Sequence, residues 1–256
     1  MPRPEADILL CSYRVSGRTW VRFMLSDCMA RACDSDQEVD LTTCFSWLPN
    51  WAWADRVGFG GFEPERLCGL PVIAAAHDVF KPMMSKHKIV WLYRDPMDIL
   101  SSRYARRPDE LRSADLGRYL DESGDIDSYS QWLNSWAAGL GQCKDVCVLG
   151  YEDLSEDRGR EMRRLCDFCD ISLSEEDFAQ VVERGSLESM RAIQSVSGVG
   201  GSNEQRVRTG GVRKFEQNLS LDDRQLLAGK VIASLEKAGV ELLERMGSGA
   251  IEYARS

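Results

Sequence analysis

Short apolar runs alternate with longer amphipathic segments along this chain. Four apolar runs predict buried strands, at residues 7–13, 71–76, 88–93 and 146–149. Segments with apolar residues at helical spacing predict helices at 19–32, 96–104, 128–138, 157–169, 174–184 and 220–246. Strands that alternate with helices are typical of a parallel sheet covered by helices. We therefore predict a single α/β domain over residues 1–256, with a central parallel sheet like that of P-loop proteins.

Three segments lack a clear period and are predicted as long loops. Residues 34–65 are rich in Trp, Gly and Pro, and residues 106–127 are polar and charged. Residues 195–214 combine glycines with arginines and a lysine. Because residues 106–127 are charged and poor in large apolar residues, we expect them to form a mobile lid.

The overall charge of the chain excludes several classes of partner. With 32 basic and 41 acidic residues among 256, the net charge is −9. Such a charge opposes non-specific binding to nucleic acid or to an anionic membrane. No apolar run approaches the ~20 residues that cross a bilayer, and the first residues lack the apolar core of a signal peptide. We predict a cytoplasmic protein that binds neither nucleic acid nor membrane.

The nine cysteines do not form a metal-binding pattern. Cys166 and Cys169 are spaced as C-x-x-C, but they lie among apolar residues at helical spacing and are expected to be core residues. A zinc site would need a second pair of ligands, and the chain has only His77 and His87 as histidines. We expect no metal and a reducing compartment.

Polar residues follow each predicted strand. The loop from Ser12 to Trp20 follows the first strand, and His77, Arg94 and Tyr151 follow the next three. In parallel sheets, ligands bind beyond the carboxyl ends of the strands. The loop can direct several backbone N–H groups at one anion, although it matches a Walker A motif only loosely because Ser12 replaces Gly and Arg18 replaces Lys. We predict a site for a phosphate-rich nucleotide beside an acid or base group.

The loop resembles the phosphosulfate-binding loop of sulfotransferases that use 3′-phosphoadenosine 5′-phosphosulfate (PAPS), Tyr-Pro-Lys-Ser-Gly-x-Thr-Trp. The residues in register are Tyr13, Ser16, Gly17, Thr19 and Trp20. A second signature of that family is matched by Arg94-Asp95-Pro96-Met97-Asp98 with Ser102. Weaker matches are Tyr151-Glu152-Asp153, Ser186-Leu187-Glu188-Ser189-Met190 and Arg208-Thr209-Gly210. The resemblance covers about residues 7–220.

The resemblance implies transfer of a sulfuryl group from PAPS to a hydroxyl or amine of a small molecule. The product would be adenosine 3′,5′-bisphosphate (PAP), and no metal would be needed. The residues implied in nucleotide binding are Arg14, Val15, Ser16, Gly17, Arg18, Thr19, Trp20, Arg94, Ser102, Tyr151, Ser186, Leu187, Met190, Arg208, Thr209 and Gly210. Arg94 and Ser102 would hold the 3′-phosphate, Trp20 would stack on adenine, and His77 would be the general base.

The same resemblance implies a role for each of the three predicted loops. Residues 34–65 and 106–127 would lie on the acceptor side, and residues 195–214 on the cofactor side. Trp47, Trp51, Trp53, Phe59 and Phe62 would wall a pocket for an aromatic or sugar-containing acceptor, although packing under a loop explains them equally well. A homodimer is compatible with the sequence.

Several positions depart from the family pattern. Val15 stands where the family has the loop Lys, Ala75 where it has a second Lys, and Thr209 where it has the Lys of Arg-Lys-Gly. The positive charge at the departing phosphate must then come from Arg18 or Arg14, with Lys81 as a third candidate. We therefore predict His77, Arg14 and Arg18 as the catalytic residues.

Two other functions stay open at this point. A P-loop kinase or NTPase would explain the loop and the parallel sheet, but it leaves the Arg94–Ser102 and Arg208–Gly210 matches unexplained. A nucleotide-binding relative without catalytic activity is favoured by Val15 and Ala75.

Overall fold

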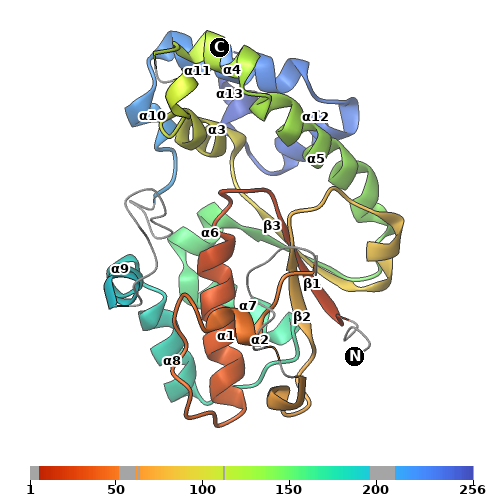
Figure 1. Ribbon diagram of the computed structural model, residues 1–256. Helices are drawn as coiled ribbons and strands as arrows, with labels where there is room; N and C mark the ends of the chain where they lie inside the picture. Colours follow the sequence, from red (N-terminus) through yellow and green to blue (C-terminus); the bar gives the residue numbers. More distant parts are fainter. Residues whose placement is uncertain (1–5, 52–61, 63, 112, 197–210, 256) are drawn as a thin grey trace.

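The computed structural model describes residues 6–51, 62, 64–111, 113–196 and 211–255 (Figure 1). The sheet has the spatial order β2-β1-β3-β4. Its strands are β1 (Ile8–Ser12), β2 (Ile73–Ala76), β3 (Lys88–Tyr93) and β4 (Val146–Gly150). Every pairing is parallel, with Cys11 opposite both Ala76 and Trp91. The predicted α/β fold and its four strands are confirmed.

Both faces of the sheet are buried, because successive side chains of a strand point to opposite faces. Leu9 and Trp91 belong to one apolar core, and Leu10 and Leu92 to the other. Helices cover each face (Figure 1). The first core is covered by α3 (Pro96–Tyr104), α4 (Leu116–Glu122), α5 (Asp125–Gly139), α10 (Phe215–Asn218), α11 (Leu221–Ala233), α12 (Lys237–Arg245) and α13 (Gly249–Ala254). The second is covered by α1 (Arg18–Ala32), α2 (Cys44–Trp47), α6 (Tyr151–Glu156), α7 (Arg158–Phe168), α8 (Glu175–Arg184) and α9 (Leu187–Val196).

The segment 106–127 is not the loop that the sequence predicted. It contains a 3-10 turn, Asp109–Leu111, then α4 and the first residues of α5. Leu116, Tyr119 and Leu120 are buried at helical spacing, and the Asp115 carboxylate accepts the Arg118 N–H at 2.8 Å as an N-cap. The few apolar residues were sufficient to anchor a short helix, so the prediction of a loop here was wrong.

The segment 220–246 forms two helices, α11 and α12, instead of the single helix predicted. The break lies at Ser234–Glu236, where the Ser234 hydroxyl donates to the Val231 carbonyl at 2.7 Å and the Glu236 N–H donates to Asn134 Oδ1 at 3.0 Å. These bonds satisfy backbone groups that a continuous helix would have paired. The sequence missed the break because Leu235 continues the apolar spacing.

The other predicted loops also contain helical residues. Residues 34–65 include α2, and the segment predicted as a loop from residue 195 begins with the last turn of α9, which ends at Val196. Residues 52–61, 63 and 197–210 lie outside the described residues. Three-residue to five-residue 3-10 turns lie at Pro64–Leu67, Pro82–Lys86 and Leu140–Gln142.

The cysteines of the C-x-x-C motif are core residues, as predicted. Cys166 and Cys169 are buried among the residues of the second core, and Cys166 Sγ lies 3.5 Å from Cys28 Sγ. No described group of histidine, cysteine and acidic residues could hold a metal ion. Across the described ranges, none of the helices combines the length and the apolar character needed to cross a membrane.

Asp98 ties the end of β3 to the chain that leads into α10. Its carboxylate is only 2% exposed, and it accepts the backbone N–H of Arg213 at 2.9 Å and of Phe215 at 3.2 Å. It also lies 3.8 Å from the Arg94 guanidinium. A buried carboxylate that accepts two backbone N–H groups fixes both segments, because either donor left without an acceptor is costly.

We expect Asp98→Ala to lower the free energy of unfolding by about 2–4 kcal/mol, because it leaves two buried N–H groups unsatisfied. Asp98→Asn keeps one carbonyl acceptor and should cost less. Urea denaturation measures both. Asp121→Ala, which removes an exposed ion pair with Lys230, is the control and should change the free energy by less than about 0.5 kcal/mol. An Asp98→Ala protein as stable as wild type would contradict the anchoring role.

Candidate functional site

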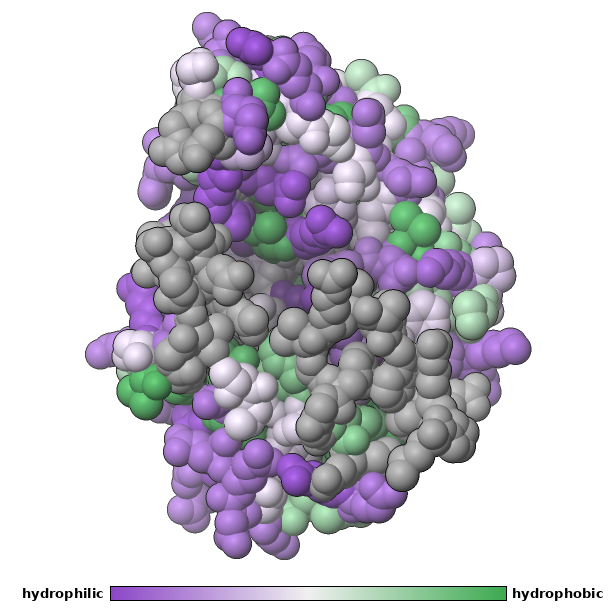
Figure 2. Space-filling model, viewed as in Figure 1, coloured by the Kyte–Doolittle hydropathy of each residue, from purple (hydrophilic) through white to green (hydrophobic). Residues whose placement is uncertain are grey.

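The carboxyl ends of the four strands bring the predicted site residues to one edge of the sheet. β1 ends at Ser12, β2 is followed by His77, β3 by Arg94 and β4 by Tyr151. The loop between β1 and α1 crosses the boundary between the two groups of helices (Figure 1). Figure 2 shows a recess on this face of the molecule, with hydrophilic residues along its margin.

The loop after β1 has a backbone that favours anion binding. Val15 and Gly17 both have a positive φ, 69° and 91°, and Gly17 is the N-cap of the fifteen-residue helix α1. A Cβ atom at Gly17 would lie 2.5 Å from the Tyr151 ring, so only glycine fits. The Ser16 hydroxyl is buried without a hydrogen-bond partner among the described atoms. An orphaned hydroxyl at a helix N-terminus fits a phosphate or sulfate group.

Arg14 and Arg18 bring positive charge to the loop, and Arg22 lies one turn further along in α1. Burial and the neighbouring Arg22 and Arg14 lower the pKa of Arg18 to about 9, which leaves it charged at neutral pH. Within the described part of the chain, neither Arg14 nor Arg18 forms an ion pair with a carboxylate. The Arg22 guanidinium is buried against Asn50 Oδ1, at 2.5 Å, and over the Phe45 ring. Like charges held close together favour the binding of an anion.

His77 is held as a neutral imidazole. Its Nδ1 lies 2.7 Å from the Ser12 carbonyl oxygen, which can only accept, so Nδ1 carries the proton and Nε2 has the lone pair. No described residue bonds Nε2. Burial and the positive charges of Arg18 and Arg14 lower the pKa of His77 to about 3. An imidazole in this state can accept a proton at Nε2 but cannot donate one there.

Arg94 joins the loop to the segment before α10. Its Nη1 donates to the Val15 carbonyl at 3.1 Å and its Nη2 to the Gly211 carbonyl at 3.2 Å. The guanidinium lies 4.1 Å from the centre of the Tyr151 ring, and its Nε is buried without a partner among the described atoms. The predicted phosphate arginine and the predicted anion loop are therefore in direct contact, which places both within reach of one ligand.

The residues predicted to surround adenine lie on the α1, α6 and α9 side of the site. The Trp20 indole N–H donates to the Gly185 carbonyl at 2.7 Å. The Trp20 ring packs edge-on against the Tyr151 ring, with 5.6 Å between the ring centres. Ser186 caps α9 by accepting the Ser189 N–H at 3.2 Å. Met190 is buried and Leu187 is partly exposed. These aromatic and apolar groups suit the face of a base, a role that stays a prediction.

No hydrogen bond links Ser102, a predicted phosphate contact, to the anion loop or to Arg94 among the described residues. The Ser102 hydroxyl accepts from Arg106 Nη2 at 2.8 Å, within the same stretch of chain. Residues 208–210, the predicted Arg-Thr-Gly, lie outside the described residues.

Lys81 is a poor substitute for the missing loop lysine. Its ammonium forms an ion pair with Asp78 at 2.5 Å and lies 5.6 Å from the Trp51 ring. The neighbouring carboxylate already balances its charge. The backbone N–H of Trp51 donates to the Ala75 carbonyl at 2.8 Å, which places Trp51 near the end of β2. Trp51 is therefore the described tryptophan best placed to line an acceptor site.

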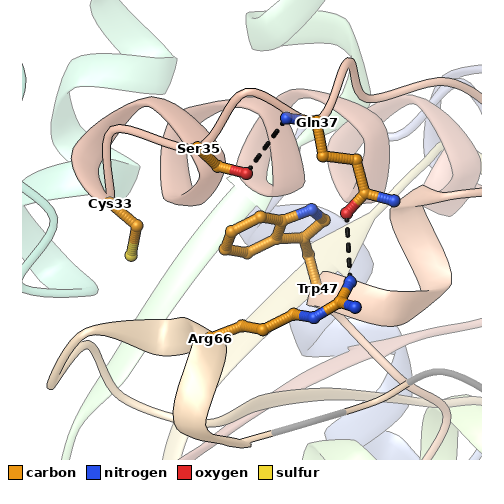
Figure 3. Close-up of a pocket in the computed structure, with 5 residues that line it drawn as sticks. All are labelled: Cys33, Ser35, Gln37, Trp47 and Arg66. Atoms are coloured by element: carbon orange, nitrogen blue, oxygen red, sulfur yellow. Dashed lines mark hydrogen bonds between the residues drawn. The ribbon is translucent and has the colours of Figure 1, made fainter.

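Trp47 does not wall this site, contrary to the sequence prediction. It is 1% exposed and lines a separate hollow of about 350 Å³ with Cys33, Ser35, Gln37 and Arg66 (Figure 3). Cys33 follows the carboxyl end of α1, whereas the anion loop precedes its amino end, so this hollow is remote from the strand ends. Trp53 and Phe59 lie outside the described residues, and Phe62 packs against the second core.

Two groups beside Arg94 were not predicted as site residues: Glu152, and Lys214, which was noted only as the lysine of the segment 195–214. Burial raises the pKa of Glu152 to about 7, and its Oε1 accepts the Asp95 N–H at 3.0 Å. The Lys214 side chain folds over Gly211, whose carbonyl Arg94 bonds. The position of Glu152 next to Tyr151 was a usable signal, but nothing local in the sequence places Lys214 near Arg94.

A family model described as a sulfotransferase domain matches residues 5–236. Sulfotransferase 2A1 of Homo sapiens is 21% identical over 207 residues, which cover 73% of this chain and 67% of that protein. Cytosolic sulfotransferase 7 of Arabidopsis thaliana is 24% identical over 212 residues, which cover 75% of this chain and 65% of that protein.

Solved structures share the fold. Mouse sulfotransferase SULT7A1 complexed with PAP superposes with a TM-score of 0.60 at 18% identity, covering 95% of this chain and 90% of that one. Retinol dehydratase in complex with androsterone and the inactive cofactor PAP superposes with a TM-score of 0.60 at 16% identity, covering 91% of this chain and 82% of that one.

We expect the His77 imidazole to stay neutral, with its proton on Nδ1, down to at least pH 5, because the nearby arginines and burial lower its pKa to about 3. The chain has only two histidines, so ¹⁵N-labelled histidine gives two imidazoles to follow by NMR across pH 5–8. His87→Gln assigns the signals. A His77 signal that titrates near the ordinary pKa of ~6.5 would contradict the electrostatic description.

Proposed function

This chain belongs to the sulfotransferase family, and on that basis we propose that it moves a sulfuryl group from PAPS to a hydroxyl or amine of a small-molecule acceptor. The observation that carries the proposal is the pairing of Arg14 and Arg18, which form no ion pair with a described carboxylate, with a neutral histidine at one edge of the sheet. The two arginines suit a polyanionic donor, and the histidine suits removal of a proton from the acceptor.

The donor would lie across the strand ends. The buried Ser16 hydroxyl and the backbone around Gly17 favour its phosphosulfate, and Arg94 favours its 3′-phosphate. Adenine would pack among Trp20, Tyr151 and the start of α9. The direct contact between Arg94 and the Val15 carbonyl supports this arrangement, because one nucleotide must touch both groups.

Transfer would be an in-line displacement at sulfur. The acceptor oxygen forms a bond to sulfur as the bond from sulfur to the bridging oxygen breaks. His77 Nε2 takes the acceptor proton, and the electron pair of the broken bond stays on the 5′-phosphate of PAP. The Ser12 carbonyl holds Nδ1–H and fixes the ring, and it stabilises the imidazolium that forms.

We assign the missing lysine charge to Arg18. Among the arginines that lower the pKa of His77, Arg18 acts most strongly, which supports a position close to the proposed base. Arg14 is exposed at the outer side of the loop and acts less strongly. Arg18 would stabilise the negative charge that develops on the leaving phosphate.

The acceptor proposal is less specific. Trp51 near the end of β2 offers an aromatic wall, which suits an apolar, aromatic or sugar face. The solved retinol dehydratase holds androsterone, an apolar ligand, and we propose small molecules with a comparable apolar face as the first acceptors to test.

The donor is tested by the rise in melting temperature with PAP and with ATP plus magnesium, followed by transfer of labelled sulfate to phenols, alcohols and sugars. We expect stabilisation by PAP, little by ATP plus magnesium, and transfer to at least one acceptor. Selective stabilisation by ATP plus magnesium would favour a kinase or NTPase. Tight binding of PAP without transfer to any acceptor would favour a non-catalytic relative.

With an active acceptor in hand, Arg18→Ala should lower kcat by about 100-fold, the typical effect of losing one donor to developing charge. Arg18→Lys should restore part of the rate. His77→Ala should remove turnover while PAP still binds. Arg118→Ala, which breaks an exposed pair with Glu122, is the control and should act as wild type. Full activity of Arg18→Ala would reject its role at the leaving group.

A further inference from the structure

The cationic side chain of Lys214 lies beside Arg94, without an ion pair to any described carboxylate. Its Cε lies 2.6 Å from the point that a Cβ atom on Gly211 would occupy, so the side chain crosses directly over Gly211. The Gly211 carbonyl in turn accepts Arg94 Nη2 at 3.2 Å. Both cationic side chains therefore contact the same residue, and the positive φ of 106° at Gly211 leaves the space that Lys214 fills.

This juxtaposition is electrostatically unfavourable without an anion. Within the described ranges, Lys214 has no carboxylate partner. Partial burial and the positive charges of Arg94 and Arg191 lower its pKa. The Asp98 carboxylate raises the pKa of Lys214, but it already accepts the N–H groups of Arg213 and Phe215 and lies 3.8 Å from Arg94. Two neighbouring cations that share one occupied carboxylate leave excess positive charge.

The position of Lys214 is fixed by the backbone. Asp98 bonds the residues on either side of it, Arg213 and Phe215, and Phe215 is fully buried in the first core. Lys214 therefore approaches Arg94 from a rigid base at the start of α10. A cation on a fixed base loses less entropy on binding than one on a free loop.

We propose that Lys214 binds the 3′-phosphate of the nucleotide together with Arg94, and so supplies the charge that Thr209 cannot. This inference rests on the proposed function, because it assumes a nucleotide with a 3′-phosphate at Arg94. It assigns to Lys214 a part in distinguishing the bisphosphate from nucleotides that lack the second phosphate. Lys214 would act as a point charge, and Arg94 as a planar donor.

The test compares the dissociation constants of PAP and of adenosine 5′-monophosphate, measured by calorimetry on the full chain. Lys214→Met keeps the length of the side chain and removes its charge. We expect its affinity for PAP to fall by about 10-fold or more, as for a lost charge-assisted bond, with less than a 2-fold change for the monophosphate. Lys214→Arg should retain most of the preference. Lys237→Met, at an exposed lysine paired with Glu241, is the matched control and should change neither constant.

The melting temperature separates binding from a structural role. Removing one of two repelling cations should leave the melting temperature of the free protein unchanged or higher, while reducing the rise that PAP produces. Equal loss of affinity for both nucleotides, or an unchanged preference for PAP in Lys214→Met, would overturn the inference. A wild-type protein that binds PAP no better than the monophosphate would overturn the proposed function as well, so the two failures are distinguishable.

Discussion

Concentrated positive charge at one edge of the sheet is the constraint on which the rest of this structure depends. The chain carries a net charge of −9, yet Arg14, Arg18 and Arg22 lie together at the end of β1, and Arg94 with Lys214 at the end of β3. Each cation raises the cost of placing the next one. Surface carboxylates elsewhere in the molecule do not relieve that cost, because solvent and salt screen them over such distances. A polyanion bound at this edge would relieve it directly.

The fold holds these cations in place through bonds that do not neutralise them. Arg94 donates to the carbonyls of Val15 and Gly211 and stacks on Tyr151, which are neutral partners, while the Asp98 carboxylate lies 3.8 Å from its guanidinium. The carboxylate of Asp98 is largely engaged by backbone N–H groups. The neutral carbonyl and aromatic partners leave the positive charge of the Arg94 guanidinium available to a ligand. They also fix the position of the guanidinium before a ligand binds. Such preorganisation lowers the free-energy cost of ordering side chains during binding.

The sequence located the site because the site lies at strand ends, and strand ends are local features. The apolar runs before His77 and Arg94 are short and sharply bounded, so the residues that follow them could be placed at one edge of a parallel sheet. The features that the sequence did not predict depend on contacts between distant segments of the chain. Lys214 meets Arg94 through Gly211, which lies 117 positions from Arg94. The helix break at Ser234–Glu236 depends on Asn134 of α5, about which the local apolar spacing carries no information.

The same charge that would bind the donor also controls the proposed base. Burial, and after it the charges of Arg18 and Arg14, lower the pKa of His77 to about 3, at which the imidazole is neutral but only weakly basic. An anion bound among these arginines would cancel part of their field and raise the pKa of His77 by that part, while the effect of burial would remain. His77 would therefore be a stronger base with the phosphosulfate in place than without it. In this site the loop arginines would bind the donor and, through it, raise the basicity of His77, so donor binding and proton transfer share one electrostatic cause.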